Sequence, residues 1–137
     1  MKKMSKFISC LLVCAALLSI FIIPCFAATP PSVTPLWDNI SDMDLVISFY
    51  GNEGNATGSM AKQSGVTKCE GTVTVYKLVG DDWIYVDSAY KSTTRTLAVS
   101  VDFVAESGVQ YKAVFEGTAY RGTVAESHTM TKYDTCP

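Results

Sequence analysis

The strongest constraint on the fold is an alternation of apolar and polar side chains that recurs after residue 36. In the run from 66 to 78, one side of an extended chain is mainly apolar and the other carries hydroxyl groups: Cys69, Gly71, Val73 and Val75 against Thr72, Thr74 and Tyr76. Successive side chains of a strand point to opposite faces, so a period of two predicts half-buried β-strands. No window of helical length shows a period of 3.6, and we therefore expect an all-β domain.

Seven runs of this kind are separated by clusters of Gly, Asn, Asp and Ser, which are typical of turns. They cover residues 45–49, 56–63, 66–78, 83–90, 97–103, 109–120 and 123–133. Short connections between them predict antiparallel hairpins, including one at Ser64 and Gly65. The expected fold is an immunoglobulin-like two-sheet antiparallel β-sandwich of about seven strands, with a closed barrel as the alternative.

A short motif favours the sandwich. Gly108 and Tyr111 form a Gly-x-x-Tyr sequence that enters a strand after an apolar strand. This motif resembles the tyrosine corner of immunoglobulin-like sandwiches, in which the phenol hydroxyl bonds to the backbone a few residues upstream. We therefore expect the Tyr111 hydroxyl to hold a connection between the two sheets.

The N-terminus has the order of a secretory signal peptide. Lysines at positions 2, 3 and 6 precede an uncharged apolar run from 7 to 23, and small residues follow up to Ala27. This order predicts a signal peptide over residues 1–27 that is cleaved, and an extracellular, secreted product. An uncleaved anchor is the alternative, because a run of about 17 apolar residues is at the short edge of what spans a bilayer.

The segment after the expected cleavage site divides into two parts. Residues 28–35 contain three prolines and are expected to form an extended N-terminal tether. Residues 36–137 are long enough for one β-sandwich domain.

Cleavage would leave an acidic protein. It removes three lysines and no acidic residue, so that 8 Lys and Arg stand against 13 Asp and Glu. Binding to nucleic acid or to anionic membranes depends on clustered Lys and Arg, and the acidic balance argues against both. We expect no nucleic acid partner, no stable membrane insertion after cleavage, and a monomer.

Two of the five cysteines, Cys69 and Cys136, lie outside the expected signal peptide. An isolated pair in an oxidising compartment is most simply one disulfide, which predicts a Cys69–Cys136 bridge. The alternative is two free thiols, one of them catalytic.

Several of these residues together resemble a group of uncharacterised small secreted proteins of Gram-positive, Clostridia-like bacteria. The shared features are Trp37 and Ile40, Phe49 with Gly51 and Asn52, the Gly71–Tyr76 strand, Gly80, Asp81 and Trp83, Gly108 with Tyr111, and Cys136. The resemblance implies an immunoglobulin-like sandwich and an extracellular location, but no reaction. In that group the first cysteine is expected near Ala56, whereas here it is Cys69.

The sequence offers little for catalysis. His128 is the only histidine, and we interpret it as a surface residue on the polar last strand, beside Glu126 and Met130. A zinc site would need a second histidine or paired thiolates, and no Gly-x-Ser-x-Gly or His-Glu-x-x-His motif is present. The close carboxylate pairs precede a strand or lie in a turn, where aspartate is favoured by local backbone bonds. We therefore expect no enzyme activity, no cofactor and no metal.

The aromatic residues suggest a binding surface. Trp83, Tyr85 and Tyr50 are expected to share one sheet face and to contact a ligand, because exposed aromatic patches usually mark a partner. The alternative is that Trp83 or Trp37 belongs to the sandwich core. The predicted function is a non-enzymatic secreted binding module with an unidentified protein or glycan partner. A secreted effector or antimicrobial polypeptide acting on neighbouring cells is the alternative.

Overall fold

All regular structure in the described part of the chain is β-strand. The computed structural model describes residues 37–137, so the predicted signal peptide (1–27) and tether (28–35) lie outside the described residues. No helix within these residues is long and apolar enough to cross a membrane. The seven strands are β1 (Ile40–Tyr50), β2 (Glu53–Lys62), β3 (Lys68–Val79), β4 (Asp82–Thr93), β5 (Leu97–Val104), β6 (Gln110–Arg121) and β7 (Val124–Thr135).

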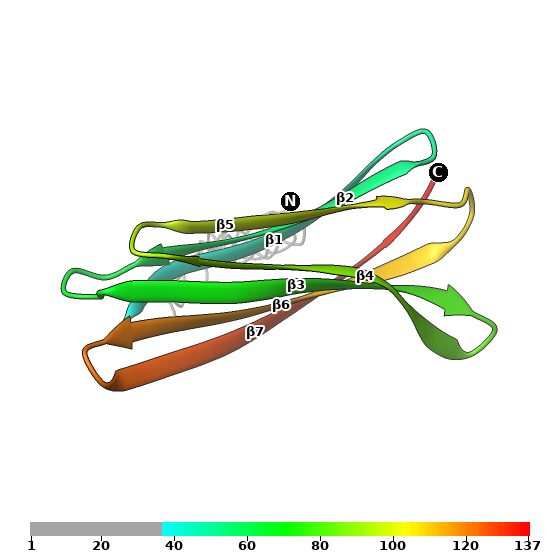
Figure 1. The fold of residues 1–137 in the computed structure, drawn as a ribbon. Helices are drawn as coiled ribbons and strands as arrows, with labels where there is room; N and C mark the ends of the chain where they lie inside the picture. Colours follow the sequence, from blue (N-terminus) through cyan, green and yellow to red (C-terminus); the bar gives the residue numbers. More distant parts are fainter. Residues whose placement is uncertain (1–36) are drawn as a thin grey trace, which may run out of the picture. The chain divides into compact units, whose positions relative to one another are not determined.

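The strands form two antiparallel sheets that lie as two layers (Figure 1). One sheet has the order β1-β2-β5 and the other the order β4-β3-β6-β7. The prediction of an all-β, seven-strand, two-sheet sandwich is confirmed. The closed barrel is wrong, because backbone pairing does not join one sheet to the other in residues 37–137.

Three connections are tight hairpins, and each contains a glycine with positive φ. They join β1 to β2, β3 to β4 and β6 to β7, through Gly51 (φ 58°), Gly80 (φ 63°) and Gly122 (φ 61°). The other three connections cross from one sheet to the other. Each sheet is therefore assembled from segments that are separated along the chain.

The hairpin predicted at Ser64 and Gly65 is wrong. Gly65 does turn the chain, with a φ of 87°. However, β2 pairs with β1 and β5 while β3 pairs with β4 and β6, so the turn leads from one sheet to the other. Turn residues reverse the chain in either case, and they do not specify which strand the next strand will pair with.

The core lies between the inner faces of the two sheets. Its centre is the ring of Phe115, which is fully buried against glycines of three strands. A Cβ atom at Gly58 of β2 would lie 2.5 Å from this ring, and one at Gly71 of β3 would lie 2.8 Å from it. The glycines are thus required for space, because they allow a large ring to fit between the sheets.

Tyr111 holds one of the crossings, as the sequence predicts. Its hydroxyl accepts a hydrogen bond of 2.9 Å from the backbone N–H of Glu106, in the connection between β5 and β6. Tyr111 is itself fully buried and contacts the rings of Phe49 and Phe103. One side chain therefore combines core packing with a fixed loop.

The structure does not contain the predicted Cys69–Cys136 disulfide. Both residues are buried free thiols. Cys69 lies opposite Ala119 near the end of β6, whereas the backbone N–H of Cys136 bonds to Val109, just before β6 begins. The length of β6 between these positions is about 30 Å at the usual rise per residue, and a disulfide needs Cα atoms within about 7 Å. The prediction is wrong because the fold places the two cysteines at opposite ends of the sandwich.

Candidate functional site

The outer face of the four-stranded sheet gathers most of the exposed aromatic side chains. Five of the seven tyrosines and one of the two tryptophans alternate with inward-pointing residues on its strands. We call this surface the aromatic face, and its rings are Tyr76, Trp83, Tyr85, Tyr90, Tyr120 and Tyr133. It is the largest concentration of aromatic side chains outside the core in the described residues.

Four side chains form a row across all four strands at one end of this face. Tyr85 of β4 lies opposite Tyr76 of β3, Tyr76 lies opposite Lys112 of β6, and Lys112 lies opposite Tyr133 of β7. Directly opposite residues of antiparallel strands point to the same face, so the register fixes this row. We call it the aromatic row.

Ring contacts hold the aromatic row together. Tyr76 meets Tyr85 edge to face with centroids 6.3 Å apart, and Trp83 lies 5.6 Å from Tyr133. The Lys112 ammonium lies 4.5 Å from the centroid of Tyr76 and 4.8 Å from that of Trp83. Such cation–π contacts stabilise the rings in place. Tyr85 and Tyr133, at the two ends of the row, still have 57% and 54% of their surface exposed.

A bulge in β4 is needed to place Tyr90 on this face. Asp87 pairs with Val75 and Tyr85 with Tyr76, so the intervening Val86 has no partner. One extra residue inverts the alternation that follows.

A strict alternation through residues 83–90 would put Ser88 and Tyr90 on the other side of β4 from Tyr85, and the bulge reverses this. After the bulge, Ser88 pairs with Thr74 and Tyr90 pairs with Thr72, both on the outer face. Ala89 packs toward the core instead.

A second cluster lies at the other end of the aromatic face. The Glu70 carboxylate accepts hydrogen bonds from the hydroxyls of Tyr90 and Tyr120 and pairs with Lys68 at 2.6 Å. Because Lys68 and both phenols bond to the charged form, the pKa of Glu70 lies below its ordinary value. The bond to Glu70 also raises the pKa of Tyr120. These exposed groups fix the orientation of their rings.

Hydroxyl side chains fill the space between the two aromatic clusters. The row next to the aromatic row consists of Ser88, Thr74, Val114 and Thr131, and the following one contains Thr72 and Thr129. The Tyr85 hydroxyl lies 3.1 Å from that of Ser88, and this hydrogen bond links the aromatic row to the hydroxyl-bearing row beside it. The aromatic face is therefore rich in rings and hydroxyl groups, and its charged residues, Lys68, Lys112, Glu70 and Glu116, are balanced in sign.

The outer face of the three-stranded sheet is different in chemistry. In the described strands its charged residues are all acidic: Asp42, Asp44, Glu53 and Asp102. Asp102 accepts a hydrogen bond of 2.7 Å from Asn55, and Thr57 bonds to Ser100, so several polar groups are already paired.

Tyr50 belongs to this acidic face and not to the aromatic face. It is the last residue of β1, is 87% exposed, and lies at the edge of a hollow of about 950 Å³ that also includes Phe103 and Asp87. The sequence predicts that Tyr50 shares a face with Trp83 and Tyr85, and the structure brings only the last two together. Alternation within a strand does not tell which sheet the strand joins, so this part of the prediction could not be made from the pattern.

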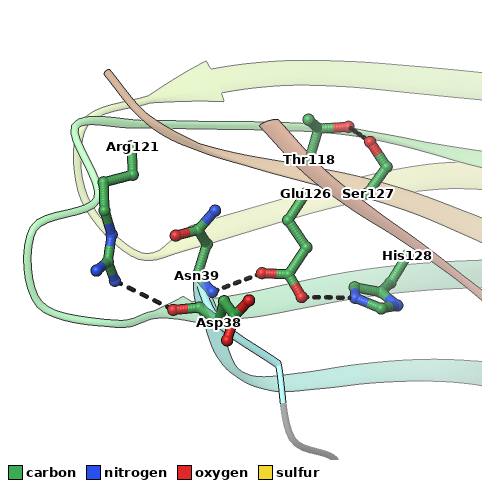
Figure 2. A network of polar contacts seen from close by, with 7 residues as sticks. All are labelled: Asp38, Asn39, Thr118, Arg121, Glu126, Ser127 and His128. Atoms are coloured by element: carbon green, nitrogen blue, oxygen red, sulfur yellow. Dashed lines mark hydrogen bonds and ion pairs between the residues drawn. The ribbon is translucent and has the colours of Figure 1, made fainter. Parts of the chain in front are cut away.

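His128 lies at the edge between the sheets rather than on a free surface (Figure 2). Its Nε2 is 2.9 Å from Oε1 of Glu126, and its ring lies 4.6 Å from that of Trp37. The other carboxylate oxygen of Glu126 accepts a hydrogen bond of 2.5 Å from the backbone N–H of Asn39, just before β1. Glu126 and His128 therefore fasten the entry to β1 onto β7, and we call this arrangement the Glu126 clasp.

The electrostatics of the Glu126 clasp favour the charged carboxylate. Burial raises the pKa of Glu126, but hydrogen bonds from His128 and from the backbone amides of Asn39 and Asp38 outweigh this effect, and the pKa lies below its ordinary value. The expectation that His128 shares a side of β7 with Glu126 and Met130 holds, but the ring is half-buried and bonded.

Beside the Glu126 clasp is a hollow of about 500 Å³. Arg121 lines it and donates a hydrogen bond of 3.1 Å to the backbone carbonyl of Asp38 (Figure 2). Nowhere in residues 37–137 do three or more His, Cys, Asp or Glu side chains come together as a metal site. The polar groups here are used to hold the edge of the sandwich.

Of the four residues in the aromatic row, sequence reasoning identifies only Tyr85 as a site residue and misses the other three. The pattern places Tyr76 on the polar side of its strand but not in a site, and it assigns no role to Lys112 or Tyr133. For Tyr76 and Lys112 the signal is present, because they alternate with the buried residues Val75 and Tyr111, whereas Tyr133 has exposed neighbours on both sides. What was lacking was the cross-strand register. The core alternative for Trp83 is wrong, because Trp83 is half-buried on the outer face; Trp37 packs against the core.

Compared with known protein families and with curated proteins, the chain matches no family model and no individual protein.

Proposed function

We propose that this chain is a secreted, non-enzymatic binding module that contacts its partner through the aromatic face of its four-stranded sheet. The observation that carries this proposal is the aromatic row, in which rings from three strands and a lysine from the fourth are brought side by side, with the two end rings more than half exposed to solvent. Exposed clusters of large aromatic side chains are uncommon on monomeric proteins and usually mark an interaction site.

The way the rings are held also supports binding. Lys112 fixes Tyr76 and Trp83 from one side, and Glu70 fixes Tyr90 and Tyr120 at the other end of the face. Side chains that are already ordered lose less conformational entropy when a partner binds. A face built in this way is suited to recognition without rearrangement.

We infer that the sandwich is of the immunoglobulin-like type. The strand orders β1-β2-β5 and β4-β3-β6-β7, the sheet-crossing connections and the bond from the Glu106 N–H to the Tyr111 hydroxyl support this inference. Folds of this type commonly act as recognition modules, although the fold alone does not define a partner.

Secretion is proposed from the N-terminal segment, whose basic, apolar and small-residue regions follow the order of a signal peptide. The resemblance to small secreted proteins of Gram-positive bacteria supports the same location. The non-enzymatic part of the proposal is supported by His128, whose ring is committed to Glu126 and Trp37 in the Glu126 clasp.

The proposal can be tested by a pull-down from the cell-wall fraction and culture medium of the producing organism. The bait is the domain after residue 27, used beside a Tyr85→Ala variant and a Tyr50→Ala variant. Both tyrosines are exposed, but only Tyr85 belongs to the aromatic face, so Tyr50→Ala is the matched control. We expect specific capture by the unchanged domain and the control, and loss of capture with Tyr85→Ala. Equal capture by all three would contradict the proposed surface.

A further inference from the structure

We infer that the partner of the aromatic face is an uncharged polysaccharide that lies across the strands along the aromatic row. This inference rests on the proposed binding function and specifies its ligand class. It starts from the direction of the row, which runs from Tyr85 on β4 to Tyr133 on β7. With neighbouring strands about 4.8 Å apart, the row is about 14 Å long, which suits several sugar rings of an extended chain.

The two kinds of side chain on this surface match the two sides of a sugar ring. A pyranose has an apolar face of C–H groups, which packs on aromatic rings, and a rim of hydroxyl groups, which need both donors and acceptors. The aromatic row supplies the rings, and the adjacent row supplies the hydroxyls of Ser88, Thr74 and Thr131. A hydroxyl side chain can donate and accept at the same time.

The charge of the surface favours a neutral ligand. Its strands carry two lysines and two glutamates on the outer side: Lys68 and Lys112, and Glu70 and Glu116. Lys68 is paired with Glu70, and the Lys112 ammonium lies against the rings of Tyr76 and Trp83. A polyanion would need clustered free cations, and this balanced surface does not provide them.

The composition also differs from that of a protein interface. Protein interfaces are enriched in Arg, Met and aromatic residues, whereas Ser and Thr are rarely important contacts there. Here the rings are interspersed with Ser and Thr, and the outer side of β4, β3, β6 and β7 carries neither Arg nor Met. Tyrosine with hydroxyl neighbours is the pattern expected for a sugar.

The test is affinity gel electrophoresis of the domain in gels containing hydroxyethyl cellulose, laminarin, xylan or galactomannan, with polygalacturonic acid as the anionic comparison. We expect at least one neutral polysaccharide to slow the domain, and Tyr85→Ala and Tyr133→Ala each to weaken this binding about tenfold or more, equivalent to about 1.4 kcal/mol. Tyr50→Ala is expected to bind as the unchanged domain does. Added salt should not weaken the interaction, because no ion pair forms.

Three outcomes would overturn the inference: no retardation by any neutral polysaccharide, retardation that Tyr85→Ala and Tyr133→Ala leave intact, or retardation by the anionic polymer alone that salt abolishes. The result can be separated from the fate of the proposed function. If neutral polysaccharides fail while pull-down capture still depends on Tyr85, the ligand class is wrong and the binding face stands. If neither assay depends on Tyr85, both proposals fail.

Discussion

The side chain of Glu126 joins two separate parts of the sandwich, β7 and the entry to β1. Its carboxylate receives a bond from His128 on the same strand and one from the Asn39 backbone at the entry to β1. These two strands are edge strands of different sheets, and the Glu126 clasp closes the side of the sandwich between them. A charged hydrogen bond acceptor in this position stabilises the fold more than a neutral one would.

The Glu126 clasp makes stability depend on pH. The pKa of Glu126 is lowered in the folded state, so its contribution is complete above the ordinary unfolded value of about 4.3 and is lost as the pH falls through the lower folded value. We expect Glu126→Gln to lower the free energy of unfolding by about 1 kcal/mol at pH 7 and to cost much less at pH 3. Urea unfolding at the two pH values measures this difference. Glu53→Gln, on an exposed strand end of the other sheet, is the control and should change little at either pH.

Tyr111 gives a second prediction at this scale. Tyr111→Phe keeps the buried ring but removes the acceptor for the Glu106 N–H, and we expect a loss of about 1 kcal/mol in the free energy of unfolding. Thermal or urea unfolding would show it. Tyr133→Phe removes a hydroxyl from an exposed ring, and it should be neutral. Equal stability of Tyr111→Phe and the unchanged domain would mean that the bond does not support the crossing.

At the scale of single strands, β4 shows how one residue decides the chemistry of a face. Without the bulge at Val86, the residues that follow would keep the alternation of the sequence, and Tyr90 would point away from Tyr85. The bulge lets β4 present aromatic side chains at both ends of the outer face while Ala89 packs inward. The binding surface that we propose is thus a product of the register as much as of the residue types.

The packing of the Phe115 ring against glycines of neighbouring strands gives the prediction at the scale of single strands. Gly58→Ala would place a methyl group 2.5 Å from the ring, and we expect it to cost about 1 to 3 kcal/mol of unfolding free energy. Ser59→Ala, one position along β2, should be close to neutral. Combining Gly58→Ala with Phe115→Leu should cost less than the sum of the two single changes, because the smaller side chain makes room. Simple additivity would contradict the steric account.

The strands could be predicted from the sequence because a period of two and turn residues are local signals. The pattern alone predicts that Tyr76 and Val75 point to opposite sides of β3, and the structure confirms it. The bulge at Val86 and the crossing at Gly65 could not be predicted, because both depend on which strand lies opposite. Pairing is set by the packing of the whole core, and local sequence does not encode it.

For the whole molecule, the two sheets present surfaces of opposite character. The outer side of the three-stranded sheet carries only acidic charges in the described strands, and the outer side of the four-stranded sheet carries rings, hydroxyls and a balanced charge. The acidic balance of the chain after residue 27 is therefore concentrated away from the proposed binding surface. An acidic opposite side favours solubility while one face is occupied.

The positions of the cysteines lead to a prediction for the whole domain. Because Cys69 and Cys136 are buried at opposite ends, we expect two thiols per domain to react with a thiol reagent in denaturant and very slow reaction in the native state. Burial also raises the pKa of Cys69, although nearby Lys62 opposes this, so little reactive thiolate forms at neutral pH. Thiol titration of the domain after residue 27, with and without denaturant, measures both quantities. Absence of reactive thiols in denaturant would show a disulfide and would contradict this arrangement.

The central claim is that the aromatic face makes the contact, and the two tryptophans allow a direct test of it. Trp83 lies on the aromatic face, whereas Trp37 lies at the Glu126 clasp between the sheets. The Trp37→Phe variant keeps only Trp83, so its tryptophan fluorescence reports on the aromatic face. The Trp83→Phe variant keeps only Trp37, so its fluorescence reports on the Glu126 clasp. On titration with the solubilised cell-wall fraction of the producing organism, we expect the emission to change in Trp37→Phe and to stay constant in Trp83→Phe. A change of emission only in the Trp83→Phe variant would place the contact near Trp37 instead and would contradict the account.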